Sequence, residues 1–514
     1  MRISIPKSLT NVDLPAANLA VSNEEFLAAI LATCSSLTAM ANIKARSGFS
    51  LRLWSVSLLG GFSVACAHYE PRPIRLGETA VQLQSRSLSD ESLREFVSAG
   101  LSREFVVWPP SAWTFDELNW VAFYYNPTLE TARAQWATAR AGKTTAAARP
   151  NPTVGLTPGY NFNAASGVSP WFPGLSVDWP IETAGKAGKR RQRAHYVAEN
   201  ARLNANSALW EIRSALRAAL IDAVAVDRRL QLLRQQMQVQ EKIINLLEQR
   251  VAAGRSTASE LTGARVLVHR LQADSADAQR TREEARGRLA EALGVTRSAV
   301  QTLSVQYPLE AQTSLPFDFA EARTAALQQR ADLLAALANY EASQAGLQIE
   351  IARQYPDVHL GTGYQWDQGE NKWNLALTLE LPVLHHNQGP IAEAKARRQE
   401  AATQLVALQL RVITEIDRAR VAWQTSVEQW ATVRRLNATM RDRVDMTSAR
   451  MAVGAADQLE MQLATSELGG GELLELEAEI RLAKDAGHLE DTLQIPFAAV
   501  ERGAEGPTVK EKAN

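Results

Sequence analysis

The sequence is poor in cysteine and histidine, and its charge is nearly balanced. Of 514 residues, two are cysteine and seven are histidine, and the formal net charge is −1. Two thiols cannot form a disulfide framework or, by themselves, a zinc site. Because the charges balance, no basic field favours nucleic acid, and no nucleic-acid partner is expected.

The short motifs of common enzymes are also missing. The chain contains no HExxH, no phosphate-cradling GxxxxGK[ST] and no GxSxG sequence. We therefore predict that the chain is not an enzyme and holds neither a cofactor nor a resident metal. Without a nucleotide site, the chain cannot supply its own energy.

Apolar runs long enough to form a membrane-spanning helix are missing after residue 66. The earlier run from Leu53 to Ala65 follows a basic stretch and ends in small residues, which is typical of a secretory signal peptide. We expect residues 40–65 to be this signal. Residues 1–39 are then a leader or the product of a start codon assigned too early.

The signal ends at a cysteine. Cys66 directly follows "SVA", which resembles a bacterial lipoprotein processing site, although Ser63 stands where leucine is usual. We expect Cys66 to be a lipid anchor on an exported protein. The alternative is an ordinary signal peptide that is cut nearby.

The chain contains an internal duplication. "RPNPTVGLTPGY" at residues 149–160 matches "RQYPDVHLGTGY" at 353–364, and "QRVAAGRSTASEL" at 249–261 matches "ARMAVGAADQLEM" at 449–461. Matches in the same order at an offset near 200 indicate a repeated unit.

Each repeat predicts the same series of elements. Apolar residues alternate with period two over about ten residues in each strand, and proline is expected to end the second strand of each hairpin, at Pro180 and Pro382. Long alanine-rich stretches with apolar residues three and four apart predict coiled-coil helices. The expected ranges are a helix at 126–148 and 330–353, a hairpin at about 152–181 and 356–382, a long helix at 188–251 and 390–453, and a return helix at 258–293 and 459–489.

The predicted strands have the length of membrane strands. Trp171, Trp366 and Trp373 lie near strand ends, where membrane barrels carry aromatic girdles. Four strands cannot close a barrel, and open edges are not tolerated in lipid, so membrane strands require oligomerisation. Three copies would give twelve strands, and two or four copies also close arithmetically. The alternative is a pair of soluble hairpins that cap a coiled coil.

The duplicated helix–hairpin–long helix–return helix unit resembles the outer-membrane efflux channel family typified by TolC. "PIETAGKAGKRRQRA" and "LPVLHHNQGPIAEAKARR" resemble its strand-to-helix junctions, and "VACAHYEPRP" resembles the start of its lipoprotein members. "ETAGK" and "NQG" are most similar to the heavy-metal, CzcC-like branch. The resemblance covers about residues 66–500.

The resemblance implies a mainly α-helical chain with a small membrane β-barrel part. Three copies would form a twelve-strand barrel in the outer membrane on a long α-helical periplasmic tunnel. Such a passive homotrimer would be in contact with outer-membrane lipid and would serve a periplasmic adaptor and an inner-membrane resistance-nodulation-division pump. The expected segments are an N-terminal and equatorial region at 66–125, repeats at 126–293 and 330–489, an equatorial segment between them at 294–329, and a tail at 490–514.

The resemblance also assigns the two return tips to the periplasmic end. Glu460 would contribute to a three-fold ring of carboxylates at the entrance, with Glu260 near it. Rings of Asp or Glu side chains favour the passage of cations. Leu463 stands where the family has a second acid, so the ring would be thinner. The alternative is that each glutamate serves the first turn of its helix. The residues expected to contact the adaptor are Gly254, Leu261, Gly454 and Met461.

Two further features are open to more than one interpretation. His385 and His386 lie at the strand-to-helix junction, where we expect a solvated turn, with a weak transition-metal contact as the alternative. Gly469, Gly470 and Gly471 interrupt a predicted return helix and indicate either a hinge or a tolerated break.

These observations predict the exit duct of a tripartite efflux system, with heavy-metal cations as substrates by resemblance. Drugs or other small molecules are the alternative substrates. The competing functions are a type I secretion duct for polypeptides and a coiled-coil scaffold outside the membrane.

Overall fold

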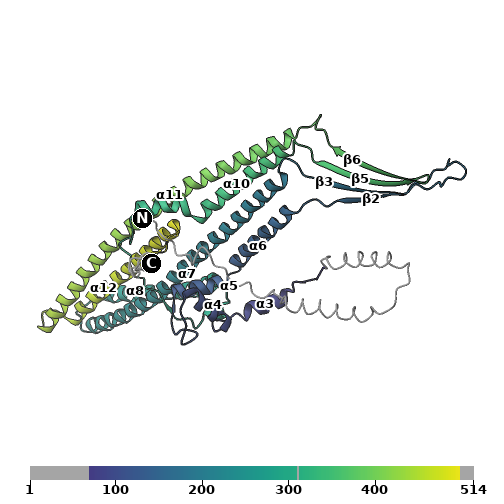
Figure 1. Ribbon diagram of the computed structural model, residues 1–514. Helices are drawn as coiled ribbons and strands as arrows, with labels where there is room; N and C mark the ends of the chain where they lie inside the picture. Colours follow the sequence, from purple (N-terminus) through teal and green to yellow (C-terminus); the bar gives the residue numbers. More distant parts are fainter. Residues whose placement is uncertain (1–68, 310–311, 498–514) are drawn as a thin grey trace, which may run out of the picture. The chain divides into compact units, whose positions relative to one another are not determined.

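The computed structural model describes residues 69–309 and 312–497 (Figure 1). The chain divides into two compact units, residues 1–85 and residues 86–514. Within the first unit, α3 (Leu76–Gln84) is described, and it buries none of its own residues. The expected leader, the signal peptide and Cys66 lie outside the described residues, as does most of the predicted C-terminal tail.

The second unit begins with two short capped helices, α4 (Glu91–Leu101) and α5 (Phe115–Tyr125), with β1 (Trp113–Thr114) between them. A capping box between Thr114 and Glu117 starts α5. Because both helices have an apolar side, they pack against the middle of a long helix. This core contains Leu93, Val97, Leu118, Val121, Leu216 and Leu220.

The first repeat has the predicted order of elements. Asn126 caps its first helix, and a proline occupies the first turn, where a missing N–H is tolerated. The elements are α6 (Pro127–Ala147), β2 (Thr153–Thr157), β3 (Gly174–Ile181), α7 (Lys186–Ala252) and α8 (Ala258–Leu293). α7 has 67 residues; a straight helix of that length spans roughly 100 Å.

The second repeat has the same order, so the predicted mainly α-helical architecture of two repeated halves is confirmed. A connection containing η2 (Arg297–Val300), β4 (Val305–Gln306) and α9 (Phe319–Gln329) precedes it; β4 pairs in parallel with β1. The elements are α10 (Ala331–Ala352), β5 (Val358–Asp367), β6 (Glu370–Leu379), α11 (Gln388–Ala452) and α12 (Gln458–Leu493).

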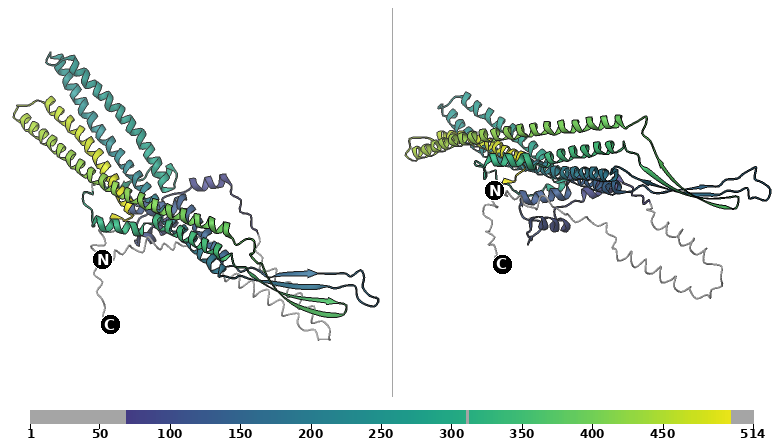
Figure 2. Two further views of the ribbon diagram at one scale, coloured as in Figure 1. Left: turned by 90° about the horizontal axis from the view of Figure 1, so that it is seen from above. Right: turned by 45° about the horizontal axis from the view of Figure 1, so that its top comes forward.

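The long helices pack as two antiparallel pairs, α7 with α8 and α11 with α12, and α7 also contacts α12. The apolar stripe predicted on α7 is buried at Ile212, Leu216 and Leu220. The α7–α8 and α11–α12 turns lie at the opposite end of this unit from the strands (Figures 1 and 2). None of the helices in the described ranges is both long and apolar enough to cross a membrane.

The two hairpins form one antiparallel sheet in the order β2-β3-β5-β6 (Figure 1). Pairing of β3 with β5, for example Leu175 opposite Tyr364, joins the first repeat to the second. β2 and β6 are therefore the edges, and each lacks an outer partner among the described strands.

The sheet has two chemically different faces, because side chains alternate along each strand. The apolar face carries Val154, Leu156, Leu175, Val177, Leu360, Leu375, Leu377 and Leu379. The polar face carries Ser176, Asp178, His359, Gly361, Gly363, Asn374 and Thr378. The apolar side chains of β2 and β6 are exposed in the single chain.

Two strand predictions need correction. β2 ends at Thr157 after five residues, and Tyr160 keeps only an isolated bridge to Trp171. Pro158 explains the interruption, because it has no N–H to donate to the ladder. The prediction that proline ends the second strands is also wrong: β3 continues through Pro180 to Ile181, and β6 ends three residues before Pro382. Pro180 is tolerated because β2 begins opposite Asp178, so Pro180 has no β2 partner.

Candidate functional site: the helix tips and the strand junctions

The first tip connects α7 to α8 through a glycine in the left-handed region. Gly254 has φ +65°, which lets the Arg255 N–H donate to the Arg250 carbonyl over 2.7 Å and closes the end of α7. Thr257 then caps α8 by accepting a hydrogen bond from the Glu260 N–H.

The second tip repeats this geometry. Gly454 has φ +73°, and the Ala455 N–H donates to the Arg450 carbonyl over 2.8 Å. Asp457 caps α12 by accepting a hydrogen bond of 3.0 Å from the Glu460 N–H. Both predicted glutamates therefore lie in the first turn of a return helix, where the helix dipole favours an acid.

The side chains at the tips are not equivalent. Arg450 Nη1 donates to Glu460 Oε1 over 2.6 Å, so this predicted gate carboxylate is paired within its own tip. Arg250 is ion-paired with Asp457, which connects the first repeat to the second. Glu260 is exposed and, within the described ranges, forms no side-chain ion pair.

Sequence reasoning missed Arg250, Arg450 and Asp457. A signal was present, because an arginine stands four residues before each tip glycine. The hydrogen bond from the Glu460 N–H, together with Arg250, outweighs partial burial and holds the pKa of the Asp457 carboxyl below its ordinary value. Asp457 is therefore a permanent negative partner at neutral pH.

The predicted adaptor-contact residues differ in exposure. Gly254 and Gly454 are exposed, whereas Leu261 and Met461 are half-buried. Leu261 packs against a small apolar cluster that contains Ile243, Leu247, Ala264 and Leu459. Part of the Leu261 surface therefore stabilises the tip itself.

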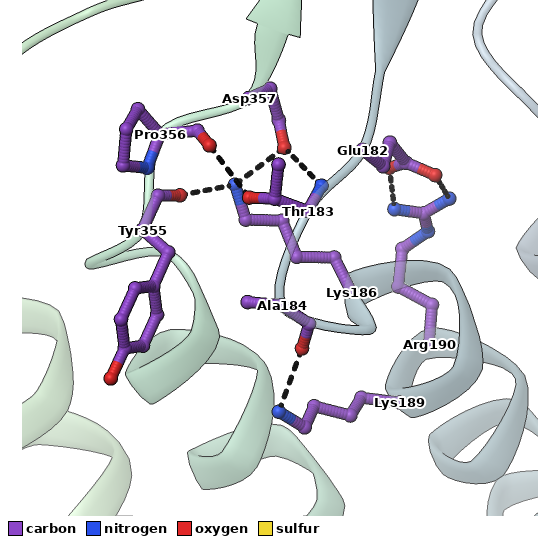
Figure 3. Close-up of polar contacts among 9 residues, drawn as sticks. All are labelled: Glu182, Thr183, Ala184, Lys186, Lys189, Arg190, Tyr355, Pro356 and Asp357. Atoms are coloured by element: carbon purple, nitrogen blue, oxygen red, sulfur yellow. Dashed lines mark hydrogen bonds and ion pairs between the residues drawn. The ribbon is translucent and has the colours of Figure 1, made fainter.

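The first strand-to-helix junction is a network of polar contacts between the two repeats (Figure 3). Asp357, just before β5, accepts hydrogen bonds on Oδ1 from the Thr183 N–H over 2.9 Å and from Lys186 Nζ over 2.8 Å. Lys186 Nζ also donates to the Tyr355 carbonyl over 2.7 Å. The start of α7 is thus fixed to the start of β5.

These polar contacts keep the Asp357 carboxyl ionised at neutral pH. Partial burial by itself raises the pKa of the carboxyl, but the hydrogen bonds from Lys186 and from the Thr183 N–H outweigh it and lower the pKa below 3.8. The ionised carboxylate therefore balances Lys186, whose side chain is only 11% exposed.

The second junction contains the histidine pair. Asn387 begins α11 with φ +57°, and its N–H donates to His385 Nδ1 over 3.2 Å. Both His385 and His386 are exposed. In the described part of the chain, no three His, Cys, Asp or Glu side chains come together as a tightly bound metal ion would require. His385 therefore acts on the local turn through its ring nitrogen.

The glycine run in α12 provides space for neighbouring side chains. A Cβ on Gly469 would approach Gln236 Nε2 of α7 to 2.5 Å, and one on Gly471 would approach Met440 Sδ of α11 to 2.7 Å. A Cβ on Gly470 would meet nothing within 4 Å in the described chain. Gly469 and Gly471 thus allow α7 and α11 to pack closely against α12. Gly470 is not needed for this packing.

The predicted interface aromatics gather toward the turn end of the hairpins. Trp171 lies against Tyr160 with ring centroids 5.0 Å apart, and Trp373 lies 4.9 Å from Tyr364. Trp366 is half-buried near the β5–β6 turn. Trp171 and Trp373 are mostly exposed, at 57% and 78%.

The chain is thus a duplicated unit with a four-stranded sheet, open at both edges, at one end and two helical tips at the other. The model of the family described as outer membrane efflux protein matches residues 122–295 and 322–491, which are the two repeats. The chain belongs to this family. It is accordingly an outer-membrane protein, and the members of its family are transport ducts rather than enzymes.

A curated relative points toward one branch. The cobalt-zinc-cadmium resistance protein CzcC of Cupriavidus metallidurans is 26% identical over 231 residues, which are 44% of this chain and 54% of the relative. The chain thus spans about half the length of the curated relative it matches. This similarity agrees with the CzcC-like junction motifs.

Solved structures share the fold. The outer membrane protein VceC of Vibrio cholerae is 20% identical with a TM-score of 0.61, over 74% of this chain and 96% of that one. CusC is 17% identical with a TM-score of 0.58, over 74% and 91%. The open-state MtrE channel of Neisseria gonorrhoeae is 17% identical with a TM-score of 0.62, over 74% and 89%.

Proposed function

We propose that three copies of this chain form the passive outer-membrane exit duct of a tripartite efflux system that expels heavy-metal cations. The four-stranded sheets would close into one barrel of twelve strands, and the long helices would line a periplasmic tunnel. A periplasmic adaptor and an energised inner-membrane resistance-nodulation-division pump would deliver the substrate.

The observation that carries this proposal is the sheet. It has an exposed apolar face, and its edges β2 and β6 are open among the described strands. Backbone groups at an open edge cannot remain unpaired in lipid. Pairing β6 of one copy with β2 of the next satisfies both edges, with the apolar face toward lipid and the polar face toward the pore.

The substrate assignment rests on the relative named for cobalt, zinc and cadmium resistance and on the "ETAGK" and "NQG" junctions. Cys66 would add a lipid anchor in the outer membrane. Both statements extend the family assignment, which by itself defines only an efflux duct.

The tips would contact the adaptor and control the periplasmic entrance. Arg250 and Asp457 join the tips of the two repeats, and Arg450 neutralises Glu460. Release of these pairs would separate the tips and leave the exposed carboxylates of Glu460 and Asp457 without their arginine partners, so that they could attract passing cations.

The test uses a bacterial host that lacks its own metal-efflux duct but keeps the adaptor and the pump. We expect the wild-type chain to raise the Zn²⁺, Co²⁺ and Cd²⁺ concentrations that stop growth by several-fold. In unheated gels of the outer-membrane fraction, it should run near three times the monomer mass, and Cys66→Ala should lose labelling by radioactive palmitate.

The outcomes separate the rival functions. A trimer in the outer membrane that leaves metal tolerance unchanged but releases a polypeptide substrate of an ABC exporter would favour a type I secretion duct. A soluble monomer would overturn the duct itself and favour the coiled-coil scaffold.

A further inference from the structure

His359 lies on the polar face of the sheet in contact with a carboxylate from the other repeat. Its Nδ1 is 2.8 Å from Oδ2 of Asp178. His359 is on β5 and Asp178 is on β3, so the pair exists only because the sheet joins the two hairpins. Both side chains remain open to solvent, at 43% and 39% exposed.

The hydrogen bond determines which imidazole nitrogen is available. An ionised carboxylate can only accept, so Nδ1 carries the proton and donates it. In the neutral imidazole, Nε2 then has a lone pair, and it has no hydrogen-bond partner within the described ranges. A carboxylate that holds Nδ1–H in this way orients the ring and strengthens Nε2 as a metal ligand.

The strand register identifies the residues beside this pair. His359 stands opposite Pro180 on β3 and Thr378 on β6, and Asp178 stands opposite Gly361, all on the polar face. Asp357, two residues before His359, interacts with it electrostatically, but Lys186 already balances the charge of Asp357. The site therefore offers one imidazole nitrogen beside the carboxylate of Asp178, and imidazole nitrogen suits divalent transition metals such as Zn²⁺, Co²⁺ and Cu²⁺.

We propose that His359, oriented by Asp178, is a transient ligand for divalent transition-metal cations on the pore wall. This inference rests on the proposed function, because the polar face lines the pore only in the closed barrel. One imidazole per copy binds weakly, and conduction requires weak sites that ions can leave. His359 would contact the ion, and Asp178 would position the ring.

The test is metal-directed oxidation of the purified, untagged full-length protein. Cu²⁺ with ascorbate oxidises the histidine to which the copper is bound, and peptide mass spectrometry locates the modified residue. His269 is an internal control, because its Nδ1 contacts the neutral amide of Gln272 at 3.1 Å rather than a carboxylate. Oxidation of His359 is expected at a Cu²⁺ concentration about ten-fold or more below that required for His269.

Variants separate metal binding from simple exposure. Asp178→Asn should raise the Cu²⁺ concentration for half-maximal His359 oxidation by about ten-fold and leave His269 unchanged. Excess Zn²⁺ should protect His359. Equal oxidation of His359 and His269, or no effect of Asp178→Asn, would overturn the inference.

The binding assay and the tolerance assay fail independently. If His359 is not selectively oxidised in a protein that still confers metal tolerance, only the role of His359 as a metal ligand in the pore is refuted. Selective oxidation of His359 in a trimer that confers no tolerance would refute the substrate assignment of the duct.

Discussion

The three adjacent glycines of α12 show how much one methyl group can matter in this molecule. Gly469 and Gly471 face polar side chains of α7 and α11, while Gly470 is exposed. Asn437, next to Gly471, is fully buried and donates to Glu475. The sequence left a hinge and a tolerated break as alternatives, and α12 is continuous through all three glycines. Which glycine is needed depends on the packing of other helices.

Substitution of each glycine by alanine should therefore have different effects. Gly471→Ala should destabilise the protein by about 1–3 kcal/mol, because Asn437 and Met440 must shift. Gly469→Ala should cost less, since the flexible end of Gln236 can move. Gly470→Ala should stabilise the helix by up to about 1 kcal/mol. Thermal unfolding followed by circular dichroism at 222 nm checks the order. A destabilising Gly470→Ala would place that face against another copy instead.

Asp357 should make the junction sensitive to acid. Its pKa is lowered in the folded protein, so its contribution is present above its ordinary value of 3.8 and is lost as the pH falls through the lower folded value. At neutral pH, Asp357→Asn should lower stability by about 1–3 kcal/mol, because Lys186 keeps its charge without a charged partner. The difference from wild type should shrink as the pH falls below 3.8.

Thermal midpoints at several values between pH 3 and pH 7 provide the measurement for Asp357→Asn. Glu393→Gln is the matched control, because Glu393 pairs with Arg397 on an exposed face of α11. The control should change stability by about 0.5 kcal/mol or less. A gap between wild type and Asp357→Asn that stays constant with pH would show that the charge of Asp357 is not involved.

Elements were predicted more successfully than contacts between elements. The start of α7 was expected at residue 188 and lies at Lys186, and its end was expected at 251 and lies at Ala252. A local signal explains the agreement at the end of α7, because the tip glycine Gly254 acts within one turn. The Arg250–Asp457 pair joins residues 207 apart in the sequence, so only the packed tips reveal it.

Charge exchange at the tips tests whether that pair holds them together. Arg250→Asp and Asp457→Arg should each open the duct and increase sensitivity to vancomycin, a large antibiotic, by several-fold. The double variant restores an opposite-charge pair and should recover resistance. Growth inhibition in the complemented host is the readout.

Arg255→Asp is the control for this exchange, since it makes the same charge change at the same tip. Arg255 contributes its backbone N–H to the tip but, among the described residues, no side-chain ion pair. Equal sensitivity in Arg255→Asp would mean that net charge rather than this pair controls the tips. A double variant as leaky as the singles would mean that the α12 cap provided by Asp457, rather than the ion pair, holds the tips.

At the scale of the whole molecule, the number of strands in the sequence predicted that several copies of the chain must assemble. The sequence did not predict how the strands are ordered in the sheet. Sequence alternation identified both hairpins, whereas the β3–β5 pairing that unites them depends on tertiary structure. That pairing places the apolar residues of both repeats on one face and leaves β2 and β6 as edges. The shortened β2 was missed because Pro158 interrupts a run whose alternation continues beyond it.

Adjacent residues on β6 provide a test of which face meets lipid. Leu375 is on the apolar face and 74% exposed, and Asn374 is on the polar face. In a membrane barrel, arginine near the middle of the lipid face costs about 2–4 kcal/mol, whereas arginine facing the pore is tolerated. Leu375→Arg should therefore abolish most of the heat-sensitive oligomer in the outer membrane, and Asn374→Arg should leave it assembled. A soluble hairpin exposes both positions to water, so equal behaviour of the two variants would contradict the membrane assignment of the sheet.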